Sequence, residues 1–160
     1  MSMFENGQYQ WRETYFVLFP RDRRPKLKTV QKAILSLHQH LTLTNLNAND
    51  DGCLESLTVL APDDFAALDI SYLAGEEVLE QVNELVDEIE PSCCGENEAA
   101  RLDELRCCDA RLDIFHFEQL VDVDQEGDEM FDPSSLLVVL EKLAEVTKGI
   151  SVDPQGGAML

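Results

Sequence analysis

Four of the five cysteines stand in two adjacent pairs, Cys93-Cys94 and Cys107-Cys108. Thiolates bind soft metals and carry redox chemistry, so the two pairs form a candidate thiol site. Their spacing, C-C-x₁₂-C-C, differs from the C-x₂-C pattern that lets two thiolates of one turn share a zinc ion. If residues 96–106 form a helix, the pairs lie about 16 Å apart, farther than the ~7 Å that a disulfide allows between Cα atoms. A loop over the same residues would permit both a disulfide and a shared metal.

A second candidate site is a basic connection between a predicted strand and a predicted helix. It contains five cations within eight residues: Arg21, Arg23, Arg24, Lys26 and Lys28. Cations at a helix N-terminus are unfavourable, because the helix dipole is already positive there, unless an anion also binds. Helix N–H groups and guanidinium groups together suit a phosphate, a sulfate or a carboxylate. The alternative is that these cations pair with acids of the same chain.

Other chemistry is less well supported by the sequence. It has no G-x-S-x-G, H-E-x-x-H, P-loop or G-x-G-x-x-G motif. Stretches that begin at Asp122 and Asn47 match the early positions of a calcium loop, but their twelfth positions are Pro133 and Thr58 instead of Glu. We therefore expect no catalytic residue, no dedicated metal site and no cofactor.

The charge of the chain is large and unevenly distributed. The 160 residues include 32 Asp and Glu but only 12 Lys and Arg, which gives a formal net charge of −20. Residues 1–32 carry seven bases and three acids (+4), and the remaining 128 residues carry five bases and 29 acids (−24). This balance argues against direct binding of nucleic acid. It also permits an acidic protein that imitates nucleic acid and occupies a nucleic-acid-binding partner.

Length and hydropathy favour one domain that lies outside the membrane. The longest strongly apolar run, residues 136–140, is far shorter than the roughly 18 residues that a membrane span needs. The N-terminus has neither a basic start nor an apolar stretch, so we expect no export signal and a cytoplasmic location. We expect a single α+β domain over residues 1–160, with flexible tails at 1–12 and 153–160.

Hydrophobic periodicity then predicts the elements that position these residues. Alternating or fully apolar runs predict strands at 14–19, 41–46, 54–61, 66–73, 111–117 and 150–152. Helical spacing predicts helices at 27–39, from Gly75 to Pro91, at 96–106 and from Pro133 to Gly149. Residues 14–19 (TYFVLF) are apolar on both faces, which is typical of a central strand covered on both sides.

This order of elements suggests a ferredoxin-like βαββαβ sheet with helices packed on it, extended by an additional strand–helix unit. The two central strands of such a sheet run parallel. The basic connection and the acidic connection at 118–132 would then leave the sheet at one edge and neutralise each other, within the chain or across a homodimer.

These observations favour a non-enzymatic cytoplasmic binding domain that is regulatory or self-associating. It would bind itself or a protein partner, without direct contact to nucleic acid or membrane. The basic connection would be its recognition surface, so we expect association to be sensitive to salt. A thiol-based metal or redox protein that uses the paired cysteines is the alternative. An acidic imitation of nucleic acid is a further one.

Overall fold

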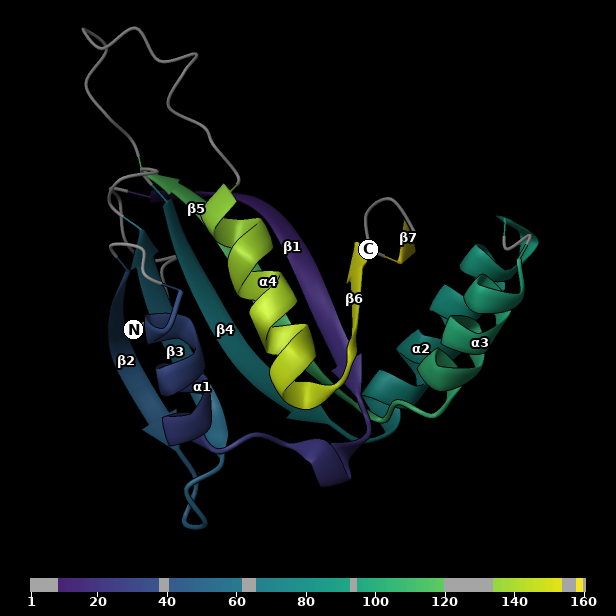
Figure 1. Cartoon of the computed structure of the whole chain (residues 1–160), viewed down its shortest axis with the longest axis horizontal. Helices are drawn as coiled ribbons and strands as arrows, with labels where there is room; N and C mark the ends of the chain where they lie inside the picture. Colours follow the sequence, from purple (N-terminus) through teal and green to yellow (C-terminus); the bar gives the residue numbers. More distant parts are fainter. Residues whose placement is uncertain are drawn as a thin grey trace, which may run out of the picture.

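Helices cover both faces of one antiparallel sheet in the computed structural model, which describes residues 9–37, 41–61, 66–92, 95–119, 134–153 and 158–159 (Figure 1). The strands are β1 (Tyr9–Phe19), β2 (Thr42–Ala48), β3 (Leu54–Ala61), β4 (Ala66–Ala74), β5 (Ala110–Gln119), β6 (Ile150–Asp153) and β7 (Ala158–Met159). The α-helices are α1 (Leu27–Leu35), α2 (Glu76–Ile89), α3 (Glu96–Arg106) and α4 (Ser134–Thr147). Two short 3₁₀ turns, η2 (Arg21–Arg23) and η4 (Glu90–Ser92), precede α1 and follow α2. The α+β class is thus confirmed.

Each element that the periodicity predicts is present, with differences at the ends. The strand β1 begins at Tyr9, five residues before the predicted start, where pairing with Gln119 of β5 extends it. The strand β6 ends at Asp153, one residue after the predicted end, and residues 158–159 pair with it as β7. That residues 1–12 and 153–160 are flexible tails stays a prediction. The first helix ends at Leu35, four residues before the predicted end.

The strand order differs from the ferredoxin-like arrangement that the pattern suggests. Along the sheet the order is β2-β3-β4-β5-β1-β6-β7, and every neighbouring pair is antiparallel. The central neighbours β1 and β5 therefore run in opposite directions. Phe19 at the end of β1 pairs with Ala110, whereas the end of β5, at Gln119, pairs with Tyr9. The prediction that the basic and acidic connections leave at one edge is wrong, since β1 and β5 end at opposite ends of the sheet. Residues 120–132 of the acidic connection lie outside the described residues.

Alternation along β1 places hydrophobic core on both sides of the sheet, as its apolar run predicts. Val17 and Phe19 pack with the apolar faces of α1 and α4. Phe16 and Leu18 point to the other face and pack with α2, α3 and β6. All four side chains are buried, so β1 fixes the position of whatever follows Phe19.

The basic connection begins where β1 ends. After Phe19 the chain passes through Pro20 and η2 into α1, next to the turns that lead into β3, β5 and β6 (Figure 1). In the part of the chain that the structure describes, no helix has both the length and the hydropathy to cross a membrane.

Candidate functional site

The N-terminus of α1 is held by the β2–β3 hairpin. The backbone N–H of Leu27 donates to the Gly52 carbonyl at 3.0 Å, and the Leu54 N–H donates to the Pro25 carbonyl at 3.0 Å. One of the free N–H groups that an anion would use is therefore already bonded within the chain. An anion at this turn must be bound mainly by side chains.

Arg24 is a structural arginine. Its Nε and Nη2 atoms donate to the Leu54 carbonyl at 3.2 and 2.9 Å, and its guanidinium lies 3.8 Å from the centre of the Tyr72 ring. Its side chain is only 19% exposed. Nη2 also lies 3.4 Å from the exposed carboxylate of Glu55. Arg24 thus joins the turn to β3 and β4, and it is poorly placed to meet a partner.

Arg21 is anchored to Asp109, the residue before β5. The Arg21 backbone N–H donates to Asp109 Oδ1 at 2.7 Å, and Arg21 Nε lies 3.0 Å from Asp109 Oδ2. The Arg21 side chain is still 65% exposed. Its charge is paired on one side and faces solvent on the other.

No described carboxylate neutralises the charges of the other three cations, Arg23, Lys26 and Lys28. Arg23 Nη1 donates to the Lys148 carbonyl at 3.1 Å, and Lys26 Nζ donates to the Asp51 carbonyl at 2.6 Å. A carbonyl accepts a hydrogen bond without neutralising a cation. Lys28 is exposed and has no ion pair with any described residue. Within the described residues, three of the five predicted cations therefore have no carboxylate partner.

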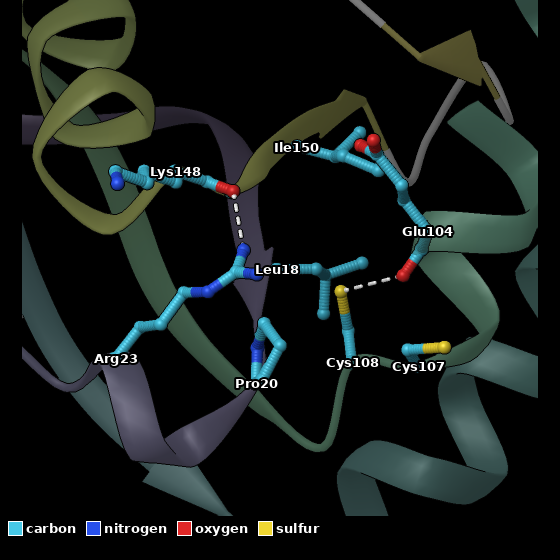
Figure 2. A pocket seen from close by; sticks show the side chains of 9 residues that line it. Leu18, Pro20, Arg23, Glu104, Cys107, Cys108, Lys148 and Ile150 are labelled. Carbon is cyan, nitrogen blue, oxygen red and sulfur yellow. Dashed lines mark hydrogen bonds between the residues drawn. The ribbon is translucent and has the colours of Figure 1, made fainter. Parts of the chain in front are cut away.

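One cavity brings the two predicted sites together. It has a volume of about 400 Å³ and lies between the end of β1, η2, the end of α3 and the start of β6 (Figure 2). The residues that line it are Leu18, Pro20, Arg23, Glu104, Cys107, Cys108, Lys148, Gly149 and Ile150. One residue of the basic connection and one cysteine pair thus line the same cavity.

The two cysteines in this cavity differ in environment. Cys108 is buried, and its Sγ donates to the Glu104 carbonyl at 3.4 Å. Burial, and then the neighbouring Cys107, raise the pKa of the Cys108 thiol to about 12. Cys107 is exposed at the end of α3. At neutral pH Cys108 is a protonated thiol, which is a weak nucleophile and a poor metal ligand.

The structure describes only one of the two predicted cysteine pairs, Cys107-Cys108. Cys93 and Cys94 lie outside the described residues. Gly95 and Cys107 flank an intact α3 of 11 residues, about 16 Å long, so residues 96–106 form a helix and not a loop. Among the residues that the structure describes, no group of three or more His, Cys, Asp or Glu side chains could hold a metal ion.

Sequence reasoning missed the residues that complete the cavity wall. Gly149 lies so close to β1 that a Cβ built on it would be 2.5 Å from the Leu18 carbonyl oxygen. Lys148 before it adopts a positive φ of 52°. The sequence pattern signals Gly149 only as a helix terminator, since the contact with β1 depends on the strand order.

Helix α2, which follows β4 in the chain, carries a strongly acidic surface. The exposed acids of α2 are Glu76, Glu77, Glu80, Glu84, Asp87 and Glu88. Several stand four residues apart, and like charges at that spacing destabilise a helix by about 0.2–0.5 kcal/mol per pair. No ion pair of these six acids occurs within the described residues.

Comparison of the chain with models of known protein families, with curated proteins and with solved structures finds no match.

Proposed function

We propose that this chain is a non-enzymatic binding module that associates with a second copy of itself, through the basic connection of one copy and the acidic face of α2 in the other. The observation that carries the proposal is the set of cations without a carboxylate partner among the described residues: Arg23, Lys26 and Lys28. They stand in a chain with a net charge of −20.

A second copy fits this surface through charge complementarity. The acidic row of α2 contains unrelieved like-charge neighbours, so a cation from a partner stabilises it. Each copy carries one basic connection and one acidic row, so a two-fold axis can pair both at once. The net charge opposes this contact, because two chains of −20 repel each other at long range.

Salt separates these two effects. The Debye length is about 30 Å at 0.01 M salt, about 10 Å at 0.1 M and about 3 Å at 1 M. Around 0.1 M the repulsion between whole molecules is screened while close charge contacts persist. We therefore expect the strongest association near 0.1 M salt, and weaker association at both extremes.

Sedimentation velocity across these salt concentrations tests the proposal with two matched variants. The first combines Arg23→Gln, Lys26→Gln and Lys28→Gln, which removes the three exposed charges without a described carboxylate partner and leaves Arg21 and Arg24 in place. The control combines substitutions of equal net charge elsewhere: Lys32→Gln, Arg106→Gln and Lys142→Gln.

A two-fold pair contains each contact twice, so three substitutions in each chain remove six exposed charge contacts. At about 0.5 kcal/mol for each contact, this loss is about 3 kcal/mol, or roughly a hundredfold in the dissociation constant. We expect the first variant to associate about a hundredfold more weakly than the native chain, and the control to associate like it. The proposal fails if the native chain is monomeric at every salt concentration, or if both variants weaken association equally.

A further inference from the structure

The cavity beside Arg23 has the size of a small-molecule site. Its volume of about 400 Å³ lies within the range of roughly 300–1,000 Å³ that ligand pockets occupy. Pro20 is half-buried and supplies apolar surface to the cavity, and Ile150 supplies a small edge; Leu18 lies fully buried beneath them. An apolar lining with few polar groups at its rim is typical of a ligand site.

Opposite charges stand on the two sides of this cavity. Figure 2 shows the Arg23 guanidinium and the Glu104 side chain reaching in from opposite sides, with Leu18 between them. The Lys148 side chain points away from Cys108, so Lys148 offers its carbonyl rather than its ammonium group. The cavity therefore has one cationic side and one anionic side.

Both charged groups retain capacity for a ligand. A guanidinium has five N–H donors, and the bond to the Lys148 carbonyl uses one of them. That bond also fixes the orientation of Arg23. The Glu104 carboxylate has no ion pair with any described residue. The Glu104 backbone carbonyl accepts from the Cys107 N–H at 3.1 Å and from Cys108 Sγ at 3.4 Å.

The field of the whole molecule selects among ligands. A chain with a net charge of −20 repels a free anion before it reaches Arg23. A zwitterion has no net charge and pays no such penalty, yet both of its ends can be paired in the cavity. The apolar lining suits an aliphatic group attached to the same carbon as the two charged groups.

We propose that this cavity binds a free α-amino acid with an aliphatic side chain. The ligand carboxylate pairs with Arg23, its ammonium group pairs with Glu104, and its side chain lies against Pro20 and Ile150. The bidentate fork of Arg23 suits a carboxylate. This inference goes beyond the proposed self-association. Both use Arg23, but neither Glu104 nor the apolar lining takes part in self-association, so Glu104→Gln separates the two.

Isothermal titration calorimetry tests it with three probes of similar shape: L-leucine, 4-methylpentanoate, which lacks the ammonium group, and 3-methylbutylamine, which lacks the carboxylate. We expect leucine to bind the native chain at least tenfold more tightly than either analogue. Arg23→Gln and Glu104→Gln should each weaken leucine binding about tenfold or more, and Arg23→Lys should restore part of it. The matched control Lys32→Gln, at an exposed position of α1 that does not line the cavity, should leave leucine binding unchanged.

Several results would overturn this assignment. One is the absence of leucine binding to the native chain at about 10 mM ligand, well above a millimolar dissociation constant. Another is equal binding of 4-methylpentanoate, which would indicate a plain anion site. A third is leucine binding that neither Arg23→Gln nor Glu104→Gln weakens. Sedimentation of the same Glu104→Gln protein reports separately on self-association, so failure of one proposal is distinguishable from failure of the other.

Discussion

Replacing Arg24 by Lys tests whether this residue is structural rather than part of the recognition surface. Lysine keeps the positive charge but loses the fork that makes two hydrogen bonds to the Leu54 carbonyl. It also loses the planar group that lies 3.8 Å from the centre of the Tyr72 ring. Hydrogen bonds from a charged donor are worth about 1.5–3 kcal/mol, and an exposed cation–π contact about 0.5–1 kcal/mol. The exposed pair with Glu55 adds little.

Part of these interactions survives in the lysine variant, so we expect Arg24→Lys to lower the free energy of unfolding by about 2 kcal/mol. Urea denaturation followed by circular dichroism measures it, with Arg23→Lys as the matched control, since Arg23 is exposed and makes one hydrogen bond. Tyr72→Leu, alone and combined with Arg24→Lys, isolates the ring contact in a double-mutant cycle. A loss below about 0.5 kcal/mol, or an equal loss in Arg23→Lys, would refute this account of Arg24.

Two further substitutions probe the frame around the site. Gly149→Ala places a methyl group 2.5 Å from the Leu18 carbonyl oxygen, and we expect a loss of about 1–3 kcal/mol by urea denaturation. Gly95→Ala has no atom within 4 Å of its new methyl group and should change stability far less; equal losses would contradict the assigned contact. Burial lowers the pKa of His116 from 6.5, more than the nearby Glu13 raises it, so the unfolded chain takes up the proton first. The contribution of His116 to the free energy of unfolding is therefore complete above pH 6.5 and declines as the pH falls toward the folded pKa. His116→Gln should make the free energy of unfolding depend less on pH in a denaturation series between pH 7.5 and 5. An unchanged pH dependence would count against this account.

Local pattern sufficed to predict the elements, because each strand or helix buries a face that its own residues define. The α2 helix follows this rule, with its buried residues at helical spacing and its acids outside. The start of β1 does not: Gln10, Arg12 and Glu13 are polar and Trp11 is exposed, and these residues form a strand because β5 lies beside them. Strand order depends on such distant pairings, and for that reason the ferredoxin-like arrangement could not be tested against the sequence alone.

The same limit applies to the candidate site. Arg24 and Lys28 are equivalent members of one basic run in the sequence. They differ because Leu54, 30 residues away, accepts two hydrogen bonds from Arg24, while Lys28 faces solvent. The sequence could likewise not place Glu104 opposite Arg23, since the strand order brings α3 and the basic connection to the same cavity.

A charge exchange between two chains tests self-association most directly. Lys28→Glu reverses an exposed charge of the basic connection, and Glu84→Lys reverses an exposed charge on α2. In a two-fold pair, a mixture of the two variants restores one opposite-charge contact and retains one native contact. Sedimentation equilibrium near 0.1 M salt should show that each variant alone associates more weakly than the native chain, and that the equimolar mixture regains native association. A mixture that associates no better than the separate variants would contradict the proposed pairing.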